Sequence, residues 1–199
     1  MLREALRTPT GTGARLCLCL IAIALWLLLT GCSNVLEDEE VDALFTQGEF
    51  LCLEAQWENA RPLLKQFLLH HPNHAGAHFY LGRTYYYSRP RLAEGEFQTA
   101  LELFIENGRM STIERYGDQY FELICNLESA KVCLLQTDQL IKRGVPPSMM
   151  GPTLERASRY VRAAGAVKPG AKDVRILEDA IAEYTSSRRT ATRRRSTNI

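Results

Sequence analysis

The sequence lacks the short motifs that mark the common classes of enzyme active site. It contains no G-x-S-x-G nucleophile elbow, no H-E-x-x-H zinc motif, no C-x-x-C pair and no phosphate-binding loop. It also lacks the alternating apolar and polar residues that predict half-buried β-strands. We therefore expect an all-helical protein that is not an enzyme and uses no cofactor.

An excess of charge of one sign is also missing. The chain has 24 Lys and Arg against 23 Asp and Glu, a net charge of +1, which argues against a nucleic-acid partner. This total hides three unequal parts, because residues 1–31 carry +2, residues 32–185 carry −6 and residues 186–199 carry +5. Attraction to anions would have to come from residues 186–199, for which a merely solvated end is the alternative.

No apolar run is long enough for a stable membrane span. The longest, Leu16–Leu29, has 14 residues and as a helix would cover about 21 Å of the roughly 30 Å of bilayer hydrocarbon. It follows a basic segment with Arg3, Arg7 and Arg15. This order is typical of a secretory signal peptide, which we place at residues 1–31.

The end of this apolar run predicts the type of signal. Leu29-Thr30-Gly31-Cys32 resembles the bacterial lipoprotein box, and the resemblance implies cleavage before Cys32 and acylation of its thiol. Ser33, rather than an aspartate, after the cysteine implies the outer membrane of a Gram-negative cell, facing the periplasm. The alternative is an ordinary cleaved signal with an incidental cysteine. Residues 32–40 would then form a short acidic tether.

Three further cysteines remain, Cys52, Cys125 and Cys133. Cys125 and Cys133 are eight residues apart in an expected helix, about 12 Å along its axis, which is too far for a disulfide. We expect all three to be buried free thiols.

Helical periodicity runs through residues 41–185, with Gly and Pro between the helices. Ser111 and Glu114 predict a capping box that starts a helix near Thr112, with a break near Asn126. An irregular loop is expected over 145–153 and a last helix over 172–185. Residues 186–199 have no apolar periodicity, so we expect a disordered basic tail.

Two segments 34 residues apart share one pattern. Leu81-Gly82-Arg83-Thr84-Tyr85, with Ala100 and Phe104 farther on, resembles the tetratricopeptide repeat (TPR). The resemblance implies an antiparallel helix-hairpin solenoid with two clear repeats, one degenerate repeat and a capping helix over 172–185. Its packing positions would be Gly48, Ala60, Pro72, Leu81, Gly82, Tyr85, Ala100, Phe104, Ala157 and Pro169. Unrelated helical hairpins are the alternative.

The same resemblance implies roles for these positions. The small residues Gly48, Gly82, Ala60 and Ala100 would let paired helices approach, and the first helix of each pair would line a partner groove. The groove positions are Phe45, Glu49, Phe79, Arg83, Tyr86 and Tyr87, together with Asp42, Cys52 and Leu53. Aromatic residues and Arg often anchor interfaces. The alternative is that Phe45 and Tyr86 only pack between neighbouring helices.

All four histidines lie within nine residues, 70–78. His74 and His78 would share a helix face and could hold zinc or copper with His70 or His71. Against a metal site, His78 occupies a packing position of the repeat, and no carboxylate or thiolate is close in sequence.

These features together predict a lipid-anchored TPR adaptor or scaffold that binds a protein partner in the bacterial cell envelope. The alternatives are an envelope protein that binds metal through His70, His74 and His78, or a structural spacer with an empty groove. The identity of the partner and the oligomeric state stay open.

Overall fold

A computed structural model describes the backbone of residues 38–196 and the side chains of residues 39–186. A boundary between two compact units falls at Asp38, and only the second unit, which begins at Glu39, is treated below. The described residues form α-helices and one 3-10 turn, with no β-strand, which confirms the all-α fold class. None of these helices has the length and hydropathy to cross a membrane.

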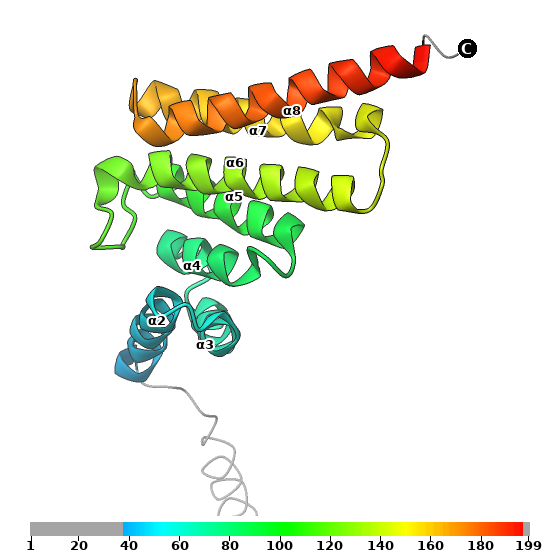
Figure 1. The fold of residues 1–199 in the computed structure, drawn as a ribbon. Helices are drawn as coiled ribbons and strands as arrows, with labels where there is room; N and C mark the ends of the chain where they lie inside the picture. The colour runs from blue at the N-terminus through cyan, green and yellow to red at the C-terminus, as the bar shows by residue number, and fades with distance from the viewer. Residues whose placement is uncertain (1–37, 197–199) are drawn as a thin grey trace, which may run out of the picture. The chain divides into compact units, whose positions relative to one another are not determined.

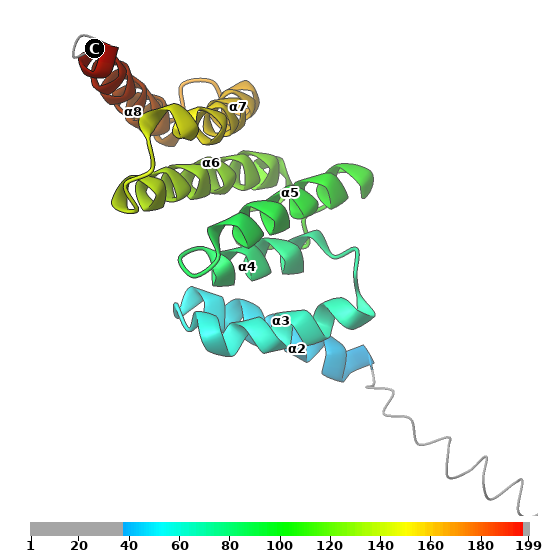
Figure 2. The same cartoon turned by 90° about the vertical axis from the view of Figure 1, so that its right-hand side faces the viewer.

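The helices follow one another as antiparallel neighbours joined by turns, with a longer connection over residues 107–117 between α5 and α6 (Figure 1). They are α2 (Asp38–Leu53), α3 (Trp57–His70), α4 (Ala75–Tyr85), α5 (Pro90–Glu106), α6 (Asp118–Lys142), the 3-10 turn η1 (Pro147–Met150), α7 (Gly151–Val167) and α8 (Lys172–Ser196). From α3 onward each α-helix contacts the next one in the chain, and α8 also contacts α6. Figure 2 shows the resulting stack from the side.

Two glycines lie where neighbouring helices approach most closely. A Cβ atom on Gly48 of α2 would lie 2.9 Å from the Leu64 side chain of α3, and one on Gly82 of α4 would lie 2.8 Å from the Phe97 ring of α5. Ala60 and Ala100 are fully buried in the facing helices. Gly48 and Gly82 therefore lie at close approaches between neighbouring helices, where a side chain would collide with the facing residue.

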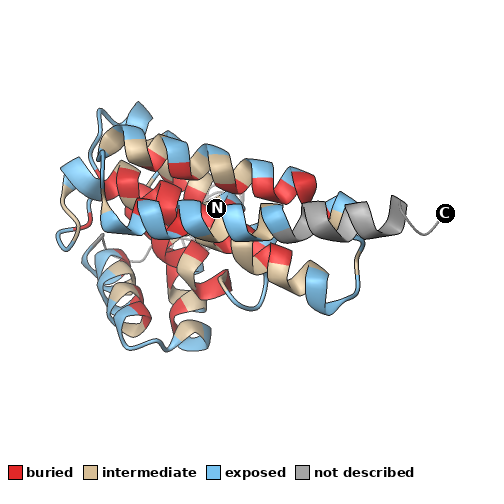
Figure 3. Ribbon diagram, turned by 45° about the horizontal axis from the view of Figure 1, so that its top comes forward, coloured by how far each residue is buried: buried red, intermediate tan, exposed pale blue. Residues whose placement is uncertain are grey.

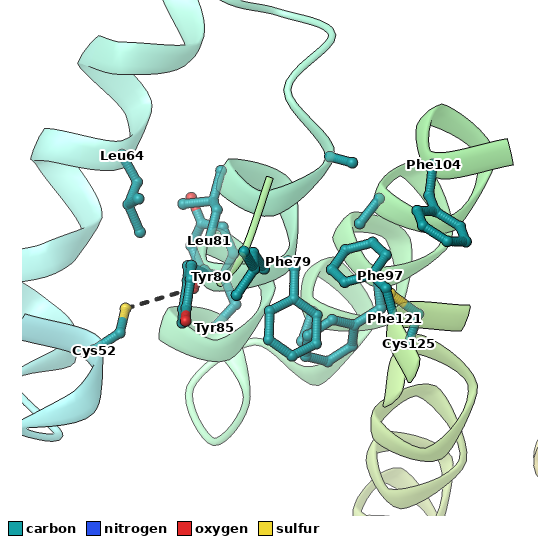
Figure 4. Packing of buried hydrophobic residues seen from close by; sticks show 14 of the residues in the cluster. Cys52, Leu64, Phe79, Tyr80, Leu81, Tyr85, Phe97, Phe104, Phe121 and Cys125 are labelled. Carbon is teal, nitrogen blue, oxygen red and sulfur yellow. Dashed lines mark hydrogen bonds between the residues drawn. The ribbon is translucent and has the colours of Figure 1, made fainter. Parts of the chain in front are cut away.

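Figure 3 marks the buried residues along the helices, and the main core among them gathers phenylalanines between α4, α5 and α6 (Figure 4). The Phe79 ring lies 5.5 Å from Phe97 and 5.6 Å from Phe121, and Phe121 lies 5.1 Å from Phe104, measured between ring centroids. All four rings are at most 1% exposed. Burying each of these side chains contributes about 1.5–3 kcal/mol, so the four rings together stabilise the contacts between the three helices.

The other predicted packing residues are buried or lie in the turns between helices. Leu81, Tyr85 and Ala157 are buried. Pro72 lies in the turn after α3, and Pro169 lies in the turn after α7.

A second core cluster joins α8 to the stack. Its buried residues are Leu123, Leu127, Ala130, Val161, Ala164, Val174 and Leu177, from α6, α7 and α8. The predicted helix over 172–185 is therefore confirmed, and it packs on the last helix pair.

Helix α6 differs from its predicted course at both its start and its middle. Thr112 has a positive φ of 59°, and the backbone N–H and Oγ of Ser111 donate to the Asp118 carboxylate at 2.7 and 2.6 Å. The helix therefore begins at Asp118, and the predicted capping box of Ser111 with Glu114 is wrong. The predicted break near Asn126 is also wrong, because Asn126 is buried and its side-chain amide donates to the Glu122 carbonyl within a continuous helix.

Two further segments are more regular than predicted. The expected loop over 145–153 contains η1, and α7 already begins at Gly151. Helix α8 continues to Ser196, so the predicted disorder from Ser186 is corrected for the backbone up to that residue. No Gly or Pro follows Gly170, and Arg favours helix, so nothing local ends α8 at Thr185.

Candidate functional site

The C-terminal end of α4 forms one wall of a small hollow of about 270 Å³. Arg83 comes from the last turn of α4, and Tyr86 and Tyr87 follow directly after it. Trp57, the first residue of α3, and Glu128 and Lys131 of α6 complete the lining. Three elements that are distant in sequence therefore meet at one surface site.

Aromatic rings make two close contacts in this hollow. The Arg83 guanidinium lies over the Trp57 ring, 5.5 Å from its centroid. The Tyr86 and Tyr87 rings meet edge to face, with centroids 4.9 Å apart. Tyr87 is 70% exposed, so most of its ring is accessible to a ligand. Exposed Tyr beside Trp and Arg is the combination that most often anchors protein interfaces.

Of the two cationic side chains in the hollow, one forms an ion pair with a carboxylate. Lys131 Nζ lies 2.8 Å from a Glu128 carboxylate oxygen, but no carboxylate in the described range pairs with Arg83. Burial raises the pKa of the Tyr86 hydroxyl, and the neighbouring Glu128 charge and Tyr87 raise it further. Tyr86 therefore stays a neutral hydrogen-bonding group, and Arg83 is available to an anionic ligand group.

Two predicted groove residues, Phe45 and Glu49 of α2, lie outside this hollow. The Phe45 ring packs half-buried against Phe67 at 5.2 Å and His74 at 4.5 Å between centroids. Glu49 accepts a hydrogen bond of 2.6 Å from the Tyr80 hydroxyl. Both side chains join α2 to its neighbours, which is the packing alternative considered for Phe45.

Two other predicted groove positions are wrong, because the side chains are in the core. Phe79 is fully buried, and Tyr116 and Phe121 cover the side of α4 that would face a groove, with ring centroids 5.6 Å from Phe79. Cys52 is 1% exposed, and its thiol donates to the Tyr80 carbonyl at 3.7 Å (Figure 4). Of the six principal groove residues, only Arg83, Tyr86 and Tyr87 meet at one site.

The sequence did not place Trp57, Glu128 or Lys131 in the groove. The repeat register assigns Trp57 to the second helix of a pair, which the family pattern places away from the groove. The repeat pattern could not be aligned with residues 112–143, so it assigned no groove positions to α6. The one sequence feature that could have identified Trp57 as a site residue is that it is a tryptophan directly after a turn.

The histidine segment packs against neighbouring elements instead of forming a ligand cluster. His74 Nδ1 accepts from the Ala77 backbone N–H at 3.0 Å, and its Nε2 lies 2.9 Å from the Thr112 hydroxyl. His78 lies 2.7 Å from the Glu96 carboxylate and 2.9 Å from the Pro72 carbonyl. Within residues 39–186, no three His, Cys, Asp or Glu side chains gather as metal ligands. His70 stays outside these contacts.

The two imidazoles have opposite pKa shifts. Burial, with the neighbouring His71, lowers the pKa of His74 to about 4, so its ring is neutral and caps α4. Burial also disfavours the charged form of His78, but the Glu96 hydrogen bond and charge outweigh it and raise the pKa of His78 above 6.5. His74 and His78 therefore each have structural contacts that account for them.

The three cysteines of the helical domain are free and buried, as predicted. Burial raises the pKa of Cys52 and Cys133 to about 12 and that of Cys125 well above 9.0. The predicted acylation site Cys32 and its box residues Leu29, Thr30 and Gly31 lie outside the described residues. No protein-family model, no curated protein and no solved structure matches this chain.

Proposed function

We propose that this chain is a lipid-anchored, TPR-like adaptor that binds a protein partner at the periplasmic face of a bacterial outer membrane. The hollow between α3, α4 and α6 carries the proposal. It combines the exposed Tyr87 ring, the Arg83–Trp57 stack and a guanidinium without a carboxylate partner in the described range.

The TPR-like part of the proposal is supported by spacing and by contact. Gly48 and Gly82 are 34 residues apart, and each lies against the following helix at the same kind of close approach, 2.9 and 2.8 Å from a virtual Cβ atom. The anchor is supported by the sequence Leu29-Thr30-Gly31-Cys32 alone.

The ligand chemistry follows from the lining. A peptide or helix that presents a carboxylate to Arg83 and an apolar side chain to the Tyr87 and Trp57 rings matches both properties of the hollow. Aromatic side chains supply contact area at low entropic cost, and Arg supplies a charge-assisted hydrogen bond.

Affinity capture from detergent-solubilised envelopes tests the adaptor. We expect the tagged chain to retain a protein partner in stoichiometric amount. The double variant Arg83→Gln, Tyr87→Ala should retain about tenfold less of this partner, as expected when interface anchors are removed. Tyr120→Ala, at another partly exposed tyrosine (40%), is the matched control and should retain the partner. Absence of any partner would favour the structural spacer instead.

Membrane fractionation tests the anchor separately. The wild-type chain should incorporate radiolabelled palmitate and sediment with membranes, since several acyl chains on one residue hold a protein firmly. Cys32→Ser should abolish both the label and the sedimentation. Labelling that persists in this variant would refute Cys32 as the attachment site.

A further inference from the structure

A cavity of about 490 Å³ lies at the edge of the stack where α5 begins, α6 ends and α7 begins. The turn before α5 and the connection after α6 meet at this edge (Figure 1). Three arginines line the cavity, Arg89, Arg91 and Arg143, and none of the described lining residues is Asp or Glu. The cavity shares no lining residue with the hollow at Arg83. We call it the arginine cavity.

The described chain does not neutralise these three arginines. None of their guanidinium groups forms an ion pair with a carboxylate in the described range. The carboxylates closest to the lining along α5 and α6 are bonded elsewhere, Glu94 to Arg156 and Asp138 to the Tyr184 hydroxyl. Glu155 of α7 lies outside the lining. Because arginine stays charged in proteins, the cavity holds three positive charges without a counter-charge from these residues.

A buried threonine in the same lining also has an unused hydrogen-bonding group. Thr153, in the first turn of α7, is only 7% exposed. Its hydroxyl makes no hydrogen bond to any described residue. Among the described residues, no fully buried side-chain oxygen lacks a partner, so the Thr153 oxygen is the part of this side chain that remains open. It is therefore available to donate to a ligand oxygen in the cavity.

The backbone at this edge adds to the preference for an anion. Helix α5 begins with Pro90, and no side chain caps its N-terminal N–H groups. Free N–H groups and the positive end of the helix dipole favour negative charge. The carbonyl end of α6 lies beside them, but Arg143, the C-cap residue of α6, supplies a positive charge there.

We propose that the arginine cavity binds the phosphate group of a phosphate monoester. Such a group carries about −1.5 to −2 charges at pH 7, and guanidinium groups bind phosphate oxygens through paired, charge-assisted hydrogen bonds. The cavity is larger than a phosphate ion, and Leu92 (47% exposed) and Leu140 give it an apolar side for the organic part of the ester. A soluble ester and a lipid headgroup both present this chemistry. The proposal goes beyond the adaptor function and uses neither the hollow at Arg83 nor the anchor at Cys32.

Isothermal titration calorimetry of the full chain in a non-ionic detergent tests the proposal. Glycerol 3-phosphate is the soluble probe and dihexanoyl phosphatidate is the lipid probe. At least one of them should bind, and the one that binds more tightly identifies the source of the ester. Dihexanoyl phosphatidylcholine, which has no phosphate monoester, is the control and should give only the heat of dilution into detergent. If neither probe exceeds this control, the proposal is overturned.

Two triple variants separate the cavity from the basic C-terminal segment, to which the sequence alone assigns any attraction to anions. The cavity variant combines Arg89→Gln, Arg91→Gln and Arg143→Gln, and it should weaken binding about tenfold or more. The control combines Arg193→Gln, Arg194→Gln and Arg195→Gln, which removes the same charge and should leave the affinity unchanged. Both should keep the wild-type helical signal in circular dichroism. An equal loss of affinity in the two variants would show general attraction to charge and overturn the proposal.

The hydroxyl of Thr153 provides a test that leaves the net charge unchanged. Thr153→Val removes the hydroxyl and keeps the branched side chain. Because this hydroxyl has no partner in the described chain, the variant should unfold at the wild-type temperature but bind the probe about tenfold more weakly, as for the loss of a hydrogen bond to a charged group. Thr153→Ser should bind like the wild type. Wild-type affinity in Thr153→Val, or in the cavity variant, would overturn the proposal.

Discussion

Arg156 of α7 donates from Nε to a carboxylate oxygen of Glu94 on α5 at 2.8 Å, across a distance of 62 residues in sequence. Three other groups, on Gln136, Tyr160 and Cys133, also donate to this carboxylate. Burial disfavours the charge on Glu94, but these donors outweigh it and lower the pKa of the carboxyl. One buried anion therefore joins α5, α6 and α7.

Removal of this anion should destabilise the fold in a pH-dependent way. Glu94→Ala leaves the Arg156 charge and the buried Gln136 amide without their acceptor, and we expect a loss of about 2–4 kcal/mol in the free energy of unfolding. Because the folded pKa of Glu94 lies below its ordinary value of 4.5, its contribution is complete above that value and disappears as pH falls through the lowered pKa. Urea unfolding at neutral and acidic pH measures the loss of unfolding free energy in the variant and its dependence on pH. If Glu94→Ala lost the same free energy at the two pH values, the lowered pKa of Glu94 would be contradicted.

Two glycine-to-alanine substitutions should act in opposite directions. A Cβ on Gly82 would meet Phe97 at 2.8 Å, so Gly82→Ala should destabilise the protein by about 1–3 kcal/mol through overpacking. Gly95, in the interior of α5, has no atom within 4 Å of its virtual Cβ. Gly95→Ala should therefore stabilise by about 0.5–1 kcal/mol through helix propensity. Thermal unfolding of both variants checks the signs, and destabilisation by both would refute the contact geometry.

The two central histidines should titrate in different ranges. The His78 pKa should lie above 6.5 and that of His74 near 4 in an NMR titration. Glu96→Gln should lower the His78 pKa and leave His74 unchanged. Because the folded His78 pKa is raised, the His78–Glu96 pair contributes stability below pH 6.5 and loses it as pH rises through the folded pKa. Identical titration of His78 in wild type and Glu96→Gln would exclude the pairing.

The three core thiols should resist alkylation in the folded protein. Iodoacetamide followed by peptide mapping should leave Cys52, Cys125 and Cys133 unmodified under native conditions, because thiolate is the reactive form and burial raises their pKa values. All three should react fully in denaturant. Rapid native labelling of Cys125, which is fully buried, would show that α6 opens.

Local signals predicted the helices and several contacts between them. The spacing of Gly48, Ala60, Gly82 and Ala100 predicted where helices touch. Two helix backbones can approach closely only where the side chains between them are small. Proline and glycine positions likewise located most helix ends. The start of α6 was missed because Ser111 bonds to Asp118, seven residues away, and no capping pattern includes that interval.

Local sequence signals identified only part of the candidate site. Arg83, Tyr86 and Tyr87 were found because they are close together in sequence at the end of one helix. Their companions Trp57 and Lys131 come from other helices, and only the packing of α3 and α6 beside α4 brings them to the same hollow.

By itself, the sequence determined that this protein is helical, that its hairpins cross at small residues and that its cysteines are buried without a disulfide. These properties follow from periodicity, side-chain size and distance along a helix, which are local. Only the tertiary structure decided which aromatic residues are accessible. Phe79 and Tyr87 lie on or beside the same helix, but Phe79 is covered by Tyr116 and Phe121 while Tyr87 is left open. Burial depends on what other segments pack against a residue, and no local pattern contains that information.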